Sequence, residues 1–243
     1  MTALLRIDKL NKRFGGLQAI GNVNLSLHSG QVTTLVGPNG AGKTTLFNMI
    51  TGHIPPTSGD IHWQDQRITG QKPWKIARLG IARTFQDLRL FGQMTVFENV
   101  LTVLERGTWL WQAGAAERRE RVEAILVQTG LADRQGARAM DLAYAERKFL
   151  SMARILAARA ALWLLDEPAS GLDPRSFERF VALLRDVAAS GVTICIIEHN
   201  LDIVTQLSDR VVFLDQGRLL AEGTATEVLS DPHLASIYFG ERT

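Results

Sequence analysis

The chain has 243 residues, of which 46% are hydrophobic and 21% charged, and its formal net charge is +2. This length and composition suit a globular protein with one large α/β domain, and no apolar run approaches the roughly 18 residues of a membrane span. Acidic and basic residues are interleaved, as in residues 117–123. Such a pattern is typical of a solvated helix face and argues against a nucleic-acid-binding surface.

The N-terminal stretch carries charge too early for a signal peptide, so we expect a cytoplasmic protein. Residues 4–7, 21–27 and 31–36 have strand patterns separated by glycine-containing turns. Phe14 stands just before the first of these turns, at Gly15-Gly16. Its ring is expected either to stack on an adenine base or to pack in the core.

A glycine-rich segment follows the third strand and precedes a helical segment over residues 44–50, and it matches G-x-x-x-x-G-K-[ST]. Its glycines let successive backbone N–H groups face an anion, and the helix N-terminus adds its positive dipole end. We expect Lys43 to reach the β- and γ-phosphates of a nucleotide and the Thr44 hydroxyl to bind Mg²⁺. The expected phosphate-binding residues are Gly37, Pro38, Asn39, Gly40, Ala41, Gly42, Lys43, Thr44 and Thr45.

Further along, residues 81–86 form a predicted strand that ends on Gln86. Helical spacing of apolar residues then dominates from residue 87 to about 159, which indicates a helical subdomain inserted into an α/β core. Trp109 and Trp111 lie within it, where they are expected either to pack locally or to form a surface for a partner.

The α/β pattern resumes with residues 161–165, which are apolar on both faces as in a central parallel strand and end on Asp166-Glu167. The remaining predicted elements are a helix at 177–188, a buried strand at 192–197 and a hairpin at 211–214 and 218–221. The only cysteine, Cys195, lies in that buried strand and is expected in the core. Strands alternating with helices predict a mainly parallel sheet, with its ligand at the carboxyl ends of the strands.

Four polar residues stand at or near predicted strand ends, and each has a possible role in ATP hydrolysis. Asp166 is placed to hold Mg²⁺ through water, together with Thr44, and Glu167 to polarise the attacking water as a general base. Gln86 would contact the metal and the γ-phosphate, and His199 would hydrogen-bond the γ-phosphate. Taken singly, these residues have plainer explanations: a helix-capping acid, a polar strand end or a core histidine. Their occurrence together after a phosphate loop favours one hydrolytic site for ATP and Mg²⁺.

Together these motifs resemble the nucleotide-binding subunits of ATP-binding cassette (ABC) transporters over essentially all 243 residues. The resemblance implies an α/β P-loop core of the RecA type at residues 1–86 and 160–243, including an N-terminal antiparallel β subdomain. It also implies an inserted helical subdomain at residues 87–159. By position, the resemblance matches Phe14 to the aromatic residue that stacks on adenine, Gln86 to the Q-loop and residues 142–146 to the signature. It matches Asp166-Glu167 to Walker B with its catalytic glutamate. Residues 170–173 correspond to the D-loop and His199 to the switch histidine.

Within that family the sequence resembles the larger ATPase subunit of branched-chain amino acid importers, in residues 83–86, 94–96 and 197–200. The resemblance implies ATP held between two ATPase subunits, identical or paralogous, on the cytoplasmic face of the inner membrane. The implied partners are integral-membrane permease subunits and, indirectly, a periplasmic solute-binding protein, with no nucleic acid. The alternatives are an ABC ATPase for export, such as lipopolysaccharide export, and a non-transport ABC protein.

The signature segment departs from the family pattern Leu-Ser-Gly-Gly-Gln at its fourth and fifth positions, which are Ala145 and Glu146. Alanine restricts the close backbone approach that glycine allows. Glu146 suits the first turn of a helix but places a carboxylate near a nucleotide, where Arg147 and Lys148 are expected to offset it. We therefore expect this segment to serve the partner's site less well than an ordinary signature.

Overall fold

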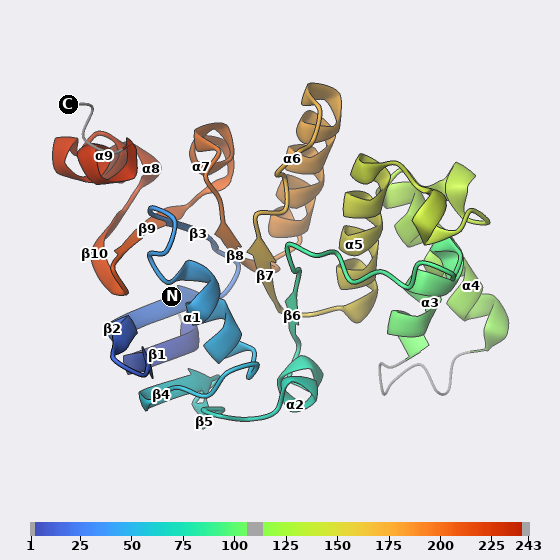
Figure 1. The fold of residues 1–243 in the computed structure, drawn as a ribbon. Helices are drawn as coiled ribbons and strands as arrows, with labels where there is room; N and C mark the ends of the chain where they lie inside the picture. Colours follow the sequence, from blue (N-terminus) through green and yellow to red (C-terminus); the bar gives the residue numbers. More distant parts are fainter. Residues whose placement is uncertain (1–2, 106–113, 240–243) are drawn as a thin grey trace.

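The computed structural model describes residues 3–105 and 114–239. Trp109 and Trp111 lie outside these residues. The described strands form two sheets, one of four strands in the order β2-β1-β4-β5 and one of six in the order β10-β9-β3-β8-β7-β6. Figure 1 shows the smaller sheet beside α1 at one side of the molecule, and a group of helices at the opposite side.

The four-stranded sheet is antiparallel throughout. Its strands are β1 (Ala3–Phe14), β2 (Leu17–His28), β4 (Ser58–Trp63) and β5 (Gln66–Arg67). Alternate apolar residues such as Leu5, Ile7 and Leu25 are buried, as the period-two side-chain pattern of a half-covered sheet requires. They pack in one core cluster with α1 (Lys43–Ile50) and with one face of the larger sheet.

The six-stranded sheet is parallel except for its edge strand β10, which pairs antiparallel with β9. Its strands are β3 (Val32–Val36), β6 (Ile81–Arg83), β7 (Leu162–Asp166), β8 (Thr193–Ile197), β9 (Arg210–Asp215) and β10 (Arg218–Gly223). Every residue of β3, β7 and β8 is buried, because helices or the smaller sheet cover both faces. Cys195 is fully buried in β8, as predicted. Parallel pairing brings the carboxyl ends of β3, β7 and β8 to one edge.

Helices flank the larger sheet and also form a separate group beyond it (Figure 1). The flanking helices are α2 (Pro73–Arg78), α6 (Pro174–Ala189), α7 (Leu201–Leu207), α8 (Ala225–Leu229) and α9 (Pro232–Phe239). The group beyond contains α3 (Val96–Glu105), α4 (Ala115–Gln128), α5 (Tyr144–Ala158) and the 3₁₀ turns η2 (Ala132–Arg134) and η3 (Ala139–Asp141). We call α3, α4 and α5 the helical group. Its apolar faces share one core cluster with α6 and β7, and the boundaries 87 and 159 of a separate subdomain stay a prediction.

Several boundaries differ from the sequence prediction; the first strand, for example, runs from Ala3 to Phe14 and not from 4 to 7, and two further differences have a clear local cause. Strand β6 ends at Arg83 and not at Gln86, because the Thr84 hydroxyl accepts the Asp166 N–H at 3.0 Å and so replaces a backbone partner. Helix α6 begins at Pro174, three residues before the predicted start, because the Asp173 side chain caps it by accepting the Ser176 N–H.

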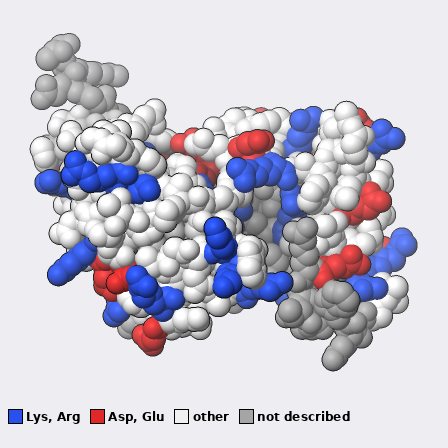
Figure 2. Space-filling model, turned by 60° about the horizontal axis from the view of Figure 1, so that its bottom comes forward, with Lys and Arg blue, Asp and Glu red and all other residues white. Residues whose placement is uncertain are grey.

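The helices within residues 3–105 and 114–239 all lack the combination of length and hydrophobicity that a membrane-spanning segment has. Two ion pairs lie along α4, Arg119 with Glu123 and Arg121 with Glu117. Figure 2 shows the face that carries β5 and α2, where basic side chains occur in several separate places with acidic side chains between them.

Candidate active site

The phosphate loop follows β3 and leads directly into α1, as the motif predicts. Gly37 has a φ of 142°, and a Cβ there would lie 1.9 Å from the carbonyl oxygen of Leu214. Gly42 has a φ of 106° and is the residue before α1. Both positions therefore require glycine, for the backbone conformation and for the close approach of another chain segment. The result is a tight turn at the positive end of a helix.

Lys43 is buried, and its ammonium group lies over the loop. The Nζ atom donates to the carbonyl oxygens of Gly37 at 2.6 Å and Pro38 at 2.9 Å. Burial lowers the pKa of Lys43, while the nearby carboxylates of Glu167 and Asp166 raise it. The cation is thus held at the mouth of the loop, close to the end of β7.

Asp166 is the last residue of β7, and its side chain is 2% exposed. The Thr44 hydroxyl lies 3.4 Å from Oδ1, and the Arg83 guanidinium donates to Oδ2 at 3.0 Å. Burial raises the pKa of Asp166, and the charge and hydrogen bond of Arg83 lower it. One oxygen of the carboxylate is therefore fixed by Arg83, and the other faces Thr44.

Sequence reasoning gave Arg83 no role beyond its place in the segment before Gln86. In the structure its guanidinium also donates to Asn48 Oδ1 of α1 at 2.7 Å and lies 4.9 Å from the centre of the Phe85 ring. Its side chain is 5% exposed. A signal did exist, because a charged side chain at the end of a predicted core strand is rarely buried unless it is paired. The sequence does not show which acid that partner is.

Glu167 follows Asp166 in a left-handed backbone conformation with a φ of 46°. Its N–H donates to the Ile197 carbonyl at the end of β8, which carries the chain on to His199. The His199 Nε2 atom lies 3.1 Å from Glu167 Oε1, a close approach without the alignment of a hydrogen bond. The structure thus brings together Lys43, Thr44, Asp166, Glu167 and His199, at the carboxyl ends of β3, β7 and β8.

Glu198 is a second buried acid that sequence reasoning did not select as a site residue. Its carboxylate accepts the Ala169 N–H at 3.2 Å and the His199 N–H at 3.3 Å. Burial raises its pKa to about 6, against the opposing effect of these hydrogen bonds. Glu198 holds the chain after Glu167 to the end of β8, and so supports the site without lying in it.

Phe14 and Gln86 are both exposed. Phe14 ends β1 and is 48% exposed, with the Lys12 ammonium 4.9 Å from its ring centre, so the alternative of a core phenylalanine is wrong. Gln86 lies beyond β6, in the segment that leads to the helical group. The roles of these two residues toward the base, the metal and the γ-phosphate stay predictions.

The signature segment begins α5, and Glu146 caps that helix. Its Oε2 accepts the Ala143 N–H at 2.8 Å, and its Oε1 accepts from Arg134 Nε at 2.9 Å. Arg134 is therefore the cation that offsets Glu146. The expectation that Arg147 and Lys148 do so is wrong, because their side chains donate to backbone carbonyls.

The donor set around Asp166 fits Mg²⁺. A carboxylate oxygen and a hydroxyl oxygen lie side by side at Asp166 and Thr44, and both are hard oxygen donors. No group of three His, Cys, Asp or Glu side chains suited to a metal occurs in the part of the chain that the structure describes. A small number of protein ligands is enough for a magnesium ion, because the ion keeps several water molecules and also binds the nucleotide phosphates.

This loop, with the acidic end of β7 and a histidine after β8, defines a P-loop nucleoside triphosphatase. The family model described as "ABC transporter" matches residues 20–170. The high-affinity branched-chain amino acid transport ATP-binding protein LivG of Escherichia coli is 38% identical over 250 residues, with 98% of each chain covered. BraF of Pseudomonas aeruginosa, described in the same words, is also 38% identical, again with 98% of each chain covered. The chain belongs to the ABC transporter family and is one of its ATPase subunits.

Solved structures agree with the fold. The ADP conformation of MJ1267, an ATP-binding cassette of an ABC transporter, matches with a TM-score of 0.88 and 31% identity, and the match covers 99% of this chain and 100% of that one. A further relative by sequence, the lipopolysaccharide export system ATP-binding protein LptB of Acidithiobacillus ferridurans, is 34% identical, and the match covers 100% of this chain and 99% of that one. The predicted α/β class, with its antiparallel N-terminal sheet, is confirmed.

Proposed function

We propose that this ABC ATPase binds and hydrolyses ATP to energise an importer of branched-chain amino acids or related small solutes. Its similarity to LivG and BraF over nearly the full length supports that solute class. The observation that carries the hydrolytic part is the cluster of Lys43, Thr44, Asp166, Glu167 and His199.

In this proposal the loop N–H groups and Lys43 bind the phosphates of ATP, and Phe14 stacks on the adenine. Thr44 and Asp166 hold Mg²⁺, with Gln86 as a further contact, and the ion would neutralise charge that develops on the phosphate oxygens. Glu167 accepts a proton from the attacking water. His199, which lies beside Glu167, donates a hydrogen bond to the γ-phosphate.

Each site would be completed by the signature of a second ATPase subunit, identical or paralogous. Integral-membrane permease subunits would take up the movement of the two ATPase subunits, on the cytoplasmic face of the inner membrane. A periplasmic solute-binding protein would act on the complex indirectly, through those permease subunits.

The second candidate is lipopolysaccharide export, which the 34% identity to LptB favours. The two candidates share the ATPase site and differ in the membrane partner. Co-expression with each set of membrane subunits, followed by affinity purification, tests which set binds this chain. The proposal expects permeases of the amino-acid type to co-purify, and expects leucine-loaded binding protein to stimulate ATP hydrolysis in proteoliposomes. Co-purification with the export subunits alone would overturn the importer assignment.

A further inference from the structure

Lys148 is a buried cation that the proposed mechanism does not use. It lies in the second turn of α5, and only 4% of its surface is exposed. Fully buried lysines are rare, because removing an ammonium group from water is unfavourable unless it is paired. Lys148 contacts no carboxylate among the described ion pairs. Its Nζ donates to the carbonyl oxygen of Glu167 at 3.2 Å and lies 5.5 Å from the Tyr144 ring centre.

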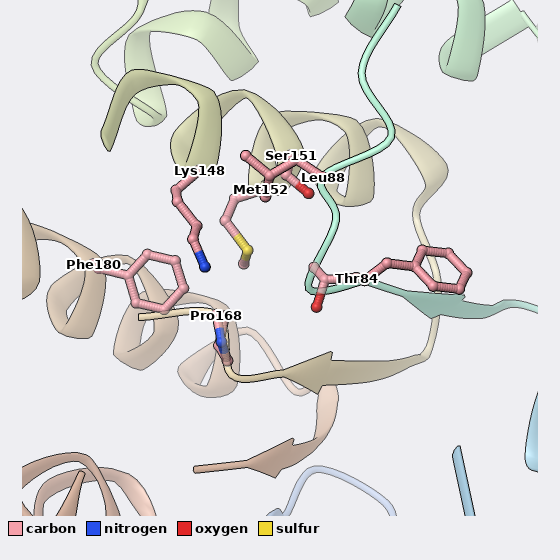
Figure 3. Close-up of a pocket in the computed structure, with 8 residues that line it drawn as sticks. Thr84, Leu88, Lys148, Ser151, Met152, Pro168 and Phe180 are labelled. Atoms are coloured by element: carbon pink, nitrogen blue, oxygen red, sulfur yellow. The ribbon is translucent and has the colours of Figure 1, made fainter. Parts of the chain in front are cut away.

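The lysine lines a small cavity of about 10 Å³, together with residues of the segment after β6, of the chain after β7 and of α6. Figure 3 shows its side chain extending from α5 between Phe180 and Met152 toward Pro168, the residue after Glu167. Thr84 and Leu88, from the segment after β6, line the same cavity. The segment that contains Gln86, the first helical turns of α5 and the chain after β7 therefore meet around one buried cation.

A second hydrogen bond, besides that from Lys148 to Glu167, joins the start of α5 to the chain after β7. The Tyr144 hydroxyl, one turn earlier in α5, donates to the Ser170 carbonyl oxygen at 3.2 Å. Gly171 is so close that a Cβ there would lie 3.0 Å from the Tyr144 ring. The start of α5 thus holds both ends of residues 167–171, which we call the catalytic loop.

The other side of the catalytic loop is held by the sheet. The Glu167 N–H donates to Ile197, and the Ala169 N–H donates to Glu198. Glu167 itself has a φ of 46°, a conformation that a non-glycine residue keeps only when its surroundings impose it. Its carbonyl accepts from Lys148 and, at 3.3 Å, from the Ser170 N–H. Lys148 is therefore the donor from the helical group that acts directly on the peptide following Glu167.

We propose that Lys148 is a positioning residue for Glu167, which ties the signature helix α5 to the backbone of the glutamate in the same chain. This inference rests on the proposed role of Glu167 as the general base. A displacement of α5 relative to the sheet would pull on the Glu167 carbonyl and turn its side chain. The start of α5 would then serve two sites. The signature residues would act on the partner's nucleotide, and Lys148 would set the orientation of Glu167 in the chain's own site.

The test compares Lys148→Met, which keeps the length and removes the donor, with Lys148→Arg, which keeps a donor. Arg119→Met is the control, because Arg119 is an exposed cation of the helical group, paired with Glu123 and remote from the catalytic loop. The measurements on the full chain are single-turnover ATP hydrolysis in the assembled transporter, ADP affinity, and hydrogen exchange of a peptide that spans residues 167–171.

Lys148→Met is expected to slow hydrolysis by about 10- to 100-fold, since misplacement of a reacting group by about 1 Å costs on that order. Its ADP affinity should stay at the wild-type value, and exchange in the catalytic loop should be faster. Lys148→Arg should restore most of the rate, and Arg119→Met should match the wild type. An equal loss of ADP affinity and rate would overturn the proposal, because it would indicate a general structural defect.

Wild-type hydrolysis by Lys148→Met, where Glu167→Gln is inactive, would also overturn it. If Glu167→Gln itself hydrolyses ATP normally, the proposed base fails first, so the two failures are distinguishable. If Lys148→Met does not fold, Tyr144→Phe provides a second test of the proposal. It removes only the hydroxyl bond to Ser170 and is expected to speed exchange in the catalytic loop and lower the rate. Unchanged exchange and rate in Tyr144→Phe would contradict a coupling through α5.

Discussion

Arg83 and Asp166 form a buried ion pair in which Arg83 Nη2 lies 3.0 Å from Asp166 Oδ2, at the centre of the proposed magnesium site. The pair fixes the rotation of the carboxylate, so that Oδ1 faces Thr44. Because Arg83 also donates to Asn48 of α1, it joins the helix after the phosphate loop to the end of β7. The guanidinium group therefore helps to set the position of the carboxylate relative to the helix that follows the loop.

Replacing Arg83 by Met should destabilise the fold and weaken the response to Mg²⁺. Removing one partner of a buried pair leaves the other charge unpaired, which costs about 3–5 kcal/mol. Urea denaturation measures that loss. Nucleotide binding with and without Mg²⁺ should show a smaller gain from the metal than in the wild type. Arg83→Lys keeps the charge but lacks the planar guanidinium that can bind Asp166 and Asn48 at once. Its stability and its response to Mg²⁺ should therefore lie between those of the wild type and those of Arg83→Met. Unchanged stability in Arg83→Met would contradict the role of the pair.

Glu198 predicts a pH dependence of stability. Its folded pKa of about 6 lies above its ordinary value of 4.5, so the folded protein binds the proton more tightly than the unfolded chain does. The resulting stabilisation is fully present below the ordinary pKa and is lost as pH rises through the folded pKa. The loss is on the order of 2 kcal/mol, at about 1.4 kcal/mol per pKa unit. Glu198→Gln should remove this component, which unfolding titrations of both proteins across the window can measure. Parallel stability curves for the two proteins would contradict the prediction.

A comparison of Gly37 with Gly40 distinguishes two reasons why the phosphate loop needs glycine: a steric contact and a backbone conformation. Both have positive φ, but a Cβ on Gly37 would strike Leu214 O at 1.9 Å, whereas nothing lies within 4 Å of a Cβ on Gly40. Gly40→Ala should cost about 1–2 kcal/mol for its conformation alone. Gly37→Ala should cost clearly more and displace β9 from the loop. Thermal unfolding and nucleotide affinity of both variants would show this order, and equal losses would argue against the close approach.

In the signature segment, the structure distinguishes Ala145 from Glu146. Glu146 is bound to Ala143 N and to Arg134, so Glu146→Gln should change turnover little. Ala145→Gly, which removes a Cβ from the first turn of α5, should raise turnover at the site that the partner's phosphate loop forms. Hydrolysis resolved by site, with each catalytic glutamate replaced in turn, measures this. A larger effect from Glu146→Gln than from Ala145→Gly would contradict it.

The sequence predicted those parts of the site that are local in the chain. The phosphate loop is one continuous segment, and Asp166-Glu167 directly follows a strand whose apolar pattern is unambiguous. Arg83, Glu198 and Lys148 were missed as site-supporting residues because their roles depend on contacts between distant segments. The Arg83 partner, for example, is 83 positions away in the sequence. The start of α6 was missed although Asp173-Pro174 is a normal capping signal, because the apolar periodicity is clear only from Phe177.

The central claim is that Glu167, held between the end of β8 and α5, is the base for ATP hydrolysis at this chain's own phosphate loop. Single-turnover hydrolysis by Glu167→Gln in the assembled transporter tests it most directly, with ATP binding measured on the same sample. The predicted result is retained binding and a rate lower by about 10²–10⁴-fold, which is the usual contribution of general-base assistance. Hydrolysis at the wild-type rate by the Gln variant would contradict the assignment.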